Sequence, residues 1–199
     1  MEFLILFLGY FFGSFPSGYL AGKIVKGIDI RSLGSGSTGA TNVLRHIGKR
    51  AAITVFLIDV LKGVLPILLA RNFFELDDSW QVVVGLSTLI GHIWPVWLNW
   101  RGGKAVATGL GIFLGLSWQV GLATLGIFIL IIALFRIVSL ASVSASLALP
   151  LIMFLSFNNS SISPPFLVVS ILAMILVIWR HRENIIRLIK GKEPRIGQK

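Results

Sequence analysis

Two glycine-rich polar stretches carry the chemistry that this otherwise apolar sequence offers. Residues 34–42 read GSGSTGATN, and residues 101–104 read RGGK. Glycine lets the backbone turn its amide N–H groups toward a ligand, and neighbouring hydroxyl, guanidinium and ammonium groups add further donors. These donors suit an anion of the phosphate type. Either stretch alone is also an ordinary turn, so their placement in the fold must decide whether they act together.

The composition indicates an integral membrane protein. Of the 199 residues, 55% are hydrophobic and 13% charged, whereas a soluble domain carries about 25% charged residues. Apolar runs repeat along the whole length with only short polar gaps between them, so we predict a single transmembrane domain over residues 1–199, of the all-α class. Because the chain contains no cysteine, disulfides, thiolate metal sites and a cysteine nucleophile are excluded.

Five apolar runs come close to the roughly 20 residues that a membrane-spanning helix needs. They are residues 3–21, 51–70, 80–98, 137–157 and 166–179. A sixth stretch, residues 105–135, holds no charge for 31 residues. As one helix it would be about 46 Å long, which exceeds one bilayer crossing, yet its halves would be rather short spans. Length alone therefore leaves six or seven helices open.

The placement of positive charge favours seven helices. The net charge of +10 could indicate a nucleic-acid partner, but in so hydrophobic a chain it is first a topology signal, and we expect no nucleic acid. With the N-terminus outside and a turn near residues 117–121, every Lys and Arg except Lys62 and Arg71 belongs to an inner segment. A single helix over residues 105–135 would move Arg136 and the seven cations of the C-terminal tail outside. We therefore predict seven transmembrane helices with a cytoplasmic C-terminus.

The first predicted helix contains small residues and a proline. A face of small residues lets membrane helices approach closely, and we expect packing as its role. We expect Pro16 to kink or end the helix, because proline lacks a backbone N–H. The small residues are Gly9, Gly13, Ser14, Ser17, Gly18 and Gly22.

Two further polar features lie within the predicted spans. Asp59 and Lys62 each cost about 2.5 to 3.5 kcal/mol on insertion scales, and their i, i+3 spacing allows them to pair on an inward face. They are either a structural ion pair or direct substrate ligands. His92, just before Trp94 and Pro95 at a helix end, is either a hydrogen-bonded interfacial histidine or part of a site.

The predicted topology gathers three polar clusters on the inner side. They are residues 34–50, residues 101–104, and the tail from His181 onward. Hydroxyls, amides and cations dominate there, while only Asp29, Glu183 and Glu193 are acidic. This inventory suits phosphate groups and lacks the oxygen ligands of a hard metal ion, so we expect no metal.

These clusters together resemble the motifs of the bacterial acyl-phosphate:glycerol-3-phosphate acyltransferases, the PlsY family. The resemblance rests on residues 34–42 with Arg45, on HIWP at 92–95 with GGKAVAT at 102–108, and on HRENIIRLIKGKE at 181–193. DVLKG at 59–63 and GSFPSG at 13–18 are similar too. The resemblance therefore spans nearly the whole chain.

The resemblance implies an enzyme of phospholipid synthesis in the bacterial inner membrane, with its active site facing the cytoplasm. It would transfer a fatty acyl group from acyl phosphate to the 1-hydroxyl of glycerol 3-phosphate, releasing lysophosphatidic acid and phosphate. No cofactor and no protein partner are implied beyond the surrounding membrane lipid. By matching position, the catalytic residues would be Ser35, Arg45, Lys104, His181 and Asn184. Substrate or phosphate binding would involve Gly34, Gly36, Ser37, Thr41, Asn42, Gly102, Gly103, Arg182 and Glu193.

The sequence departs from the family pattern at two positions. Ser37 stands where the family commonly has Asn, which exchanges an amide for a hydroxyl. Ala105 stands where a third glycine is usual. We expect Ala105 to be helical, because alanine is well tolerated in a helix but strained in the left-handed region.

The resemblance also suggests roles for the matched residues. Ser35 and nearby amides would position or polarise the acyl phosphate, while Arg45 and Lys104 would neutralise phosphate charge. His181 and Asn184 would orient glycerol 3-phosphate. Either His181 or the leaving phosphate could take the hydroxyl proton, and we favour positioning with substrate assistance.

Two other functions are weighed against this one. An acyl-CoA-dependent acyltransferase of the common type would carry His followed five residues later by Asp, but the three histidines are followed at that offset by Ala51, Trp97 and Ile186. A transporter of organic phosphates is the alternative from another class. Transporter sites lie near the midplane, often between inverted repeats, whereas the clusters here lie at one face and no repeat is found.

Overall fold

The computed structural model describes residues 2–159 and 163–197, and every regular element in these ranges is helical. The chain divides into two compact units, Met1–Leu116 and Ser117–Lys199. Lys199, one of the tail cations used to predict the topology, lies outside the described residues. The prediction of a single domain stays a prediction.

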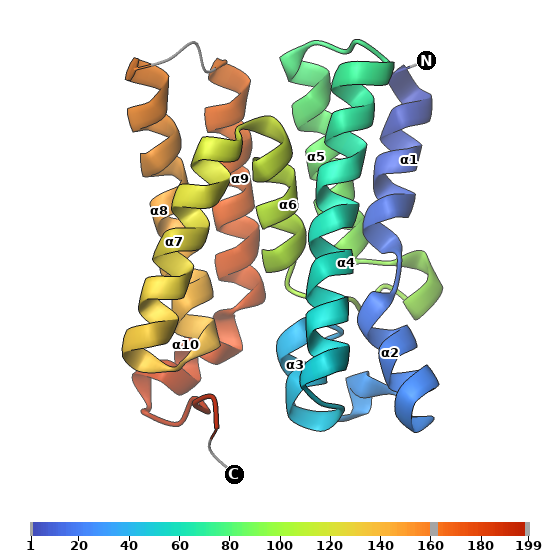
Figure 1. Cartoon of the computed structure of the whole chain (residues 1–199), viewed down its shortest axis with the longest axis vertical. Coiled ribbons are helices and arrows are strands. Elements are labelled where there is room, and N and C mark those ends of the chain that lie inside the picture. The colour runs from blue at the N-terminus through green and yellow to red at the C-terminus, as the bar shows by residue number, and fades with distance from the viewer. Residues whose placement is uncertain (1, 160–162, 198–199) are drawn as a thin grey trace. The chain divides into compact units, whose positions relative to one another are not determined.

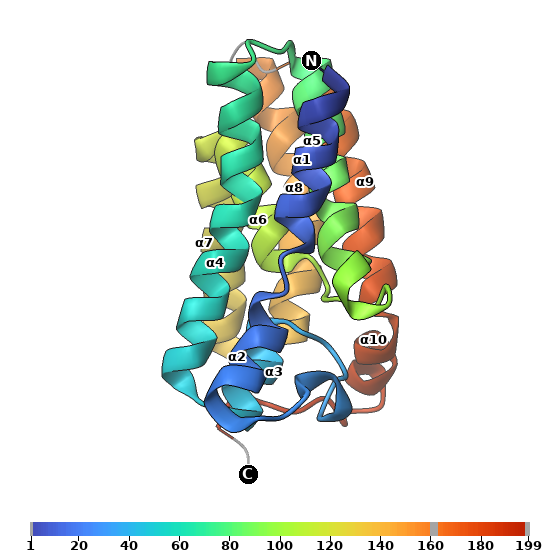
Figure 2. The ribbon, with the colours of Figure 1, turned by 90° about the vertical axis from the view of Figure 1, so that its right-hand side faces the viewer.

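The first unit is a bundle in which α1 packs on α5 and α4 packs on α6 (Figure 1). The short helices α2 and α3 lie at the end of the unit away from the N-terminus, as Figure 2 also shows. The α-helices are α1 (Glu2–Ser14), α2 (Ser17–Lys26), α3 (Ala40–His46), α4 (Lys49–Leu68), α5 (Asp78–Ile93) and α6 (Val106–Leu116). Three short turns of other helix types join them: η1 (Ile30–Ser32), η2 (Leu69–Phe73) and η3 (Val96–Leu98).

Small residues bring these helices into close contact, as predicted for the first of them. A methyl group on Gly13 would strike the backbone carbonyl of Thr88 on α5, and one on Gly91 would strike that of Tyr10 on α1. The α4–α6 pair interlocks in the same way through Gly63 and Gly111. Glycine at these positions therefore lets two helix backbones touch.

The two predicted helix interruptions are confirmed. The first helix stops at Ser14 and restarts as α2 at Ser17, on either side of Pro16. The apolar stretch 105–135 divides at Ser117, whose backbone is extended, between α6 and α7 (Trp118–Phe135). α6 has only 11 residues, which gives it about 16 Å of length, roughly half the thickness of a bilayer core.

The expectation that Ala105 is helical is wrong. Its φ is 60°, in the left-handed region, and the helix begins one residue later at Val106. Ala105 instead joins the turn at 101–104 to α6, and its carbonyl accepts the N–H of Gly109 at 2.8 Å. A left-handed alanine costs about 1 to 2 kcal/mol, which a glycine there would avoid.

Five helical segments in the described residues are long and apolar enough to span a membrane by themselves. The bent pair α9 (Pro164–Arg180) and α10 (Arg182–Ile189) adds a sixth candidate, and α6 is a shorter apolar helix. The protein is thus an all-helical chain with several membrane-spanning segments.

The second unit packs α7 on α8 (Val138–Asn159) and α8 on α9. α10 leaves the axis of α9 at an angle of 62° and contacts α8 and α9. The tail then returns to the α7–α8 turn, where the Ile196 N–H donates to the Arg136 carbonyl at 2.7 Å.

Candidate functional site

The loop at 34–42 is shaped by the side chain of Asn42. Its NH₂ group donates toward the backbone carbonyls of Ile30, Leu33 and Ser37 at 2.9–3.0 Å. Its Oδ1 accepts the backbone N–H of Ser35 at 3.3 Å, and only 2% of the residue is exposed. Asn42 therefore organises the loop from within, and its amide hydrogens are committed to the backbone.

Glycine is required at the start of this loop. Gly34 and Gly36 have φ of 57° and 65°, and both are exposed. A methyl group on Gly34 would lie 2.5 Å from Asn42 Oδ1 and would also strike the ring of His46. Both positions therefore have a left-handed backbone, which residues with a side chain adopt only with strain.

Ser37 faces the interior of the loop. Its hydroxyl accepts the N–H of Gly39 at 3.3 Å, and the residue is buried. Thr41 is partly exposed on the first turn of α3.

Ser35 and Arg45 differ from these loop-building residues. Ser35 is partly exposed and Arg45 is exposed. Over residues 2–159 and 163–197 neither the Ser35 hydroxyl nor the Arg45 guanidinium has a hydrogen-bond partner. The loop scaffold therefore presents a hydroxyl and a cation whose donors are available to a ligand.

Arg31, just before this loop, links it to the segment after α5. Arg31 contacts the Asp29 carboxylate at 2.7 Å and donates from Nη1 to the carbonyl of Leu98 at 2.8 Å. The hydrogen bond from Arg31 lowers the pKa of Asp29 below its ordinary value, so the pair is charged at neutral pH. The sequence motifs gave no sign of this link, because Leu98 lies 67 residues from Arg31.

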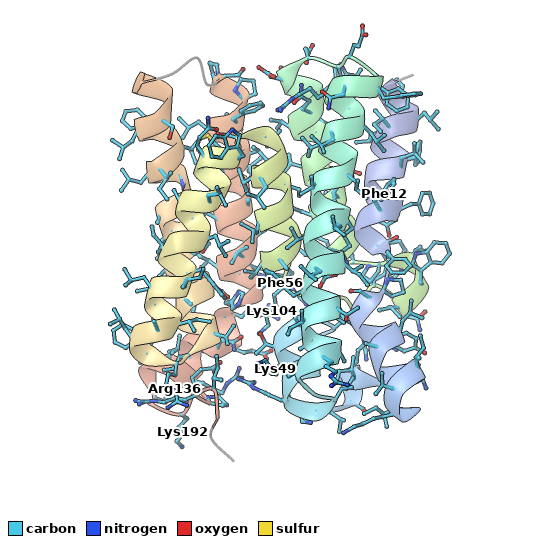
Figure 3. The ribbon with its side chains drawn as sticks, viewed as in Figure 1. Phe12, Lys49, Phe56, Lys104, Arg136 and Lys192 are labelled. Atoms are coloured by element: carbon cyan, nitrogen blue, oxygen red, sulfur yellow. The ribbon has the colours of Figure 1, made fainter. Side chains whose placement is uncertain are left out.

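The turn at 101–104 folds back on the end of α5. The N–H groups of Gly102 and Gly103 donate to the carbonyls of Ile93 and His92, both at 3.1 Å. Both glycines are buried, and a methyl group on either would collide with His92. The turn places the partly buried Lys104 two residues before the start of α6 (Figure 3).

Asp59 and Lys62 form the ion pair that one interpretation of the sequence predicts. Lys62 Nζ lies 2.7 Å from Asp59 Oδ1, and both side chains are almost completely buried. Ser17, which the sequence suggested only as a packing residue, donates its hydroxyl to Asp59 at 2.6 Å. The pair is therefore part of the interior of the first unit, level with the break between α1 and α2.

In the second unit a buried carboxylate holds the tail. Glu193 Oε1 accepts from Asn184 at 2.6 Å and from Ser139 at 2.8 Å, and Oε2 accepts from Arg187 Nε at 2.7 Å. Burial raises the pKa of Glu193, but the hydrogen bonds from Asn184, Arg187 and Ser139 outweigh it and leave the pKa below its ordinary value. Ser139 was missed because no local pattern relates it to a residue 54 positions away.

His181 lies at the junction of α9 and α10 and is buried. Its Nδ1 lies 2.8 Å from the carbonyl of Val177. A carbonyl only accepts, so Nδ1 carries a hydrogen and donates it to Val177. Arg182 is exposed, and its guanidinium donates to the Trp179 carbonyl and lies over the Trp179 ring at 5.1 Å.

The predicted residues are divided between the two units. The first unit holds the loop of Ser35, Asn42 and Arg45 and the turn before Lys104. The second holds His181, Asn184 and Glu193, with Arg182 beside Trp179. Within the described ranges no three His, Asp or Glu side chains lie close enough to hold a metal ion.

Comparison with known proteins identifies close relatives of the chain. Residues 3–191 match the profile of the family described as glycerol-3-phosphate acyltransferase. A glycerol-3-phosphate acyltransferase of Prochlorococcus marinus (strain NATL2A) is 85% identical over 198 residues, covering 100% of both chains.

Two crystal structures of PlsY, an integral membrane glycerol 3-phosphate acyltransferase, have the same fold. The glycerol 3-phosphate form aligns with a TM-score of 0.92 at 38% identity, covering 98% of this chain and 96% of that one. The lysophosphatidic acid form aligns with a TM-score of 0.89 at 37% identity, covering 98% and 95%. The family resemblance noted in the sequence is therefore confirmed.

Proposed function

The chain belongs to the glycerol-3-phosphate acyltransferase family, and we propose that its acyl donor is an acyl phosphate. The protein is an acyltransferase that acts on glycerol 3-phosphate. The related PlsY structures were determined in glycerol 3-phosphate and lysophosphatidic acid forms, which correspond to an acceptor and a product of the proposed reaction. The other product would be inorganic phosphate.

Acyl transfer from an acyl phosphate requires no covalent intermediate with the protein, because the phosphate is already a good leaving group. The 1-hydroxyl oxygen of glycerol 3-phosphate attacks the carbonyl carbon, and the bond from that carbon to the phosphate oxygen breaks. The phosphate leaves with the electron pair and takes up the hydroxyl proton. The protein must hold two highly charged substrates together and stabilise the charge that develops on the carbonyl oxygen. The absence of Asp five residues after any histidine supports this donor over acyl-CoA.

The observation that carries the proposal is the loop built around Asn42, with its uncommitted donors. The Ser35 hydroxyl and the Arg45 guanidinium project from a backbone that Asn42 holds in shape. We assign Ser35 to the acyl phosphate and Arg45 and Lys104 to phosphate charge, because charge-assisted hydrogen bonds to phosphate are among the strongest. Gly34, Gly36, Gly102 and Gly103 would let the backbone approach these phosphates.

In the second unit we assign His181 and Asn184 to the orientation of glycerol 3-phosphate. The hydrogen bond from Nδ1 to the Val177 carbonyl fixes the ring, and we propose that Nε2 faces the substrate hydroxyl. Glu193 would support Asn184 from behind. We favour positioning by His181, with the leaving phosphate as the base.

Replacement of His181 separates these two roles. If His181 positions the acceptor, His181→Ala raises the KM for glycerol 3-phosphate at least tenfold and leaves most of kcat. A loss of kcat at saturating glycerol 3-phosphate, with KM unchanged, would instead assign the proton transfer to His181. Glu183→Gln, at an exposed position in the first turn of α10, is the control for a general disturbance of the α9–α10 junction.

The donor is tested with the purified protein reconstituted in liposomes and supplied with labelled glycerol 3-phosphate. Acyl phosphate is expected to give labelled lysophosphatidic acid, and acyl-CoA is not. Product from acyl-CoA alone would overturn the donor assignment. Uptake of label without product would favour the alternative of an organic-phosphate transporter.

A further inference from the structure

A buried polar network links the break in the first helix to the turn that carries Lys104. We infer that Asp59 is a positioning residue for Lys104, acting through His92 and the Gly102–Gly103 backbone. The inference rests on the proposed role of Lys104 in neutralising phosphate charge.

The network begins where Pro16 interrupts the first helix. The Lys62 ammonium donates to the carbonyl of Phe15 at 3.0 Å, and the Ser17 hydroxyl donates to Asp59 at 2.6 Å. These contacts hold both sides of the break against the middle of α4. The two opposite groups lie 2.7 Å apart, so each offsets the cost of burying the other.

His92 extends the network from α4 to α6. Its Nδ1 lies 4.0 Å from Asp59 Oδ1 and 3.0 Å from the hydroxyl of Thr108. His92 is 5% exposed and Thr108 is fully buried. The ring therefore lies between the Asp59 carboxylate and Thr108 in the first turn of α6.

The same ring fills the space beside the turn. A methyl group on Gly103 would strike His92 Nε2, and the Gly103 N–H donates to the His92 carbonyl at 3.1 Å. A rotation of the ring would therefore displace Gly103, and Lys104 is the next residue in the chain. The orientation of His92 and the position of Lys104 depend on each other.

Asp59 is suited to positioning and unsuited to substrate contact. It is 1% exposed, and Oδ1 is already within hydrogen-bond distance of Ser17 and Lys62. A carboxylate would also repel the phosphates that Lys104 is proposed to bind. Asp59 therefore affects the reaction indirectly, by fixing the position of His92 and of the turn beside it.

A double-mutant cycle tests this dependence. Asp59→Asn is expected to lower kcat/KM roughly 100-fold, the size of loss expected when a binding group is displaced by about 1 Å. If Asp59 acts through Lys104, the variant that combines Asp59→Asn with Lys104→Gln loses no more activity than Lys104→Gln alone. Multiplication of the two losses would overturn the inference.

A charge-neutral variant separates positioning from stability. Asp59→Asn leaves Lys62 buried without its carboxylate, so a lower unfolding temperature is expected. Asp59→Asn with Lys62→Met removes both charges and is expected to recover much of that temperature while kcat/KM stays low. Full recovery of kcat/KM along with stability would mean that Asp59 is only structural.

The control is Arg71, a cation in η2 just after the C-terminal end of α4. Arg71 donates to Gln81 at 3.1 Å and to the Leu116 carbonyl at 3.0 Å. Arg71→Met is expected to lower the unfolding temperature without changing kcat/KM. If Lys104→Gln itself kept wild-type activity, the inference would fall together with the role of Lys104, while acyl transfer by the unaltered protein would still stand.

Discussion

The two glycines of the 101–104 turn have different neighbours, and this difference predicts different mutants. A methyl group on Gly102 would strike the backbone carbonyls of His92 and Ile93, whereas one on Gly103 would strike the His92 ring. Overpacking of this kind costs about 1 to 3 kcal/mol. Because a side chain can be removed and a carbonyl cannot, His92→Ala should restore stability to Gly103→Ala and leave Gly102→Ala unimproved.

Thermal unfolding of the two single and two double variants in detergent checks this expectation. His92→Ala alone provides the baseline, since it removes the contact to Thr108. Equal rescue of both glycine variants would contradict the geometry of the turn.

Glu193 predicts a specific loss of stability in acid. Its native pKa lies below the ordinary 4.5 because the hydrogen bonds from Asn184, Arg187 and Ser139 outweigh burial. The unfolded chain therefore binds a proton more readily than the native one, so the stabilisation is fully present above the unfolded pKa. It is lost as pH falls through the depressed native pKa.

Glu193→Gln should therefore lower the free energy of unfolding by about 2 kcal/mol near neutral pH, because hydrogen bonds to a charged group are lost. The difference from wild type should shrink in acid. Unfolding temperatures between about pH 3 and pH 7 measure it. A difference that stayed constant with pH would contradict the assignment of the charge to Glu193.

Contacts between residues close in the sequence could be predicted, whereas contacts between distant segments could not. The Asp59–Lys62 pair was predictable because i, i+3 spacing places both on one helical face. The three carbonyls that Asn42 holds and the Ser139 contact of Glu193 depend on folding between distant segments. Ala105 was predicted wrongly because its left-handed backbone arises from the turn before it and not from alanine's own preference.

At the scale of the helices, the breaks were predictable and the pairings were not. Pro16 marks one break, because its missing N–H cannot continue the helical ladder. Length and charge predicted the division near Ser117. Neither signal shows that α1 packs on α5 and α4 on α6, since these pairings depend on glycines that meet across two helices.

The glycine contact between α4 and α6 predicts a marked difference between two Gly→Ala variants. A methyl group on Gly63 would strike the backbone carbonyl of Thr108, whereas Gly126 on α7 has no atom within 4 Å of the added carbon. Gly63→Ala should destabilise the protein by about 1 to 3 kcal/mol. Gly126→Ala should be neutral or slightly stabilising, because alanine favours the helix. Equal unfolding temperatures for the two variants would contradict the close α4–α6 contact.

At the scale of the whole molecule, the number of membrane crossings depends on whether the short α6 spans the bilayer. We propose seven crossings, with both the Ser35 loop and the C-terminal tail in the cytoplasm. α6 has 11 residues and covers about half of a bilayer core, so length does not establish that it crosses. The positive charges after α7 and α9 support seven crossings, because an even number would place the tail outside.

Single-cysteine labelling tests this topology, because the natural chain has no cysteine. Ser79, Ser32 and Lys190 are exposed and lie in the first turn of α5, in η1 and just after α10. In intact cells a membrane-impermeant maleimide should label Ser79→Cys, and it should reach Ser32→Cys and Lys190→Cys only after the membrane is permeabilised. Labelling of Lys190→Cys from outside, with Ser32→Cys still protected, would mean that α6 and α7 together cross once. The second unit would then have the opposite orientation, and His181 and Asn184 would lie across the membrane from Ser35, where they could not act on the same substrates.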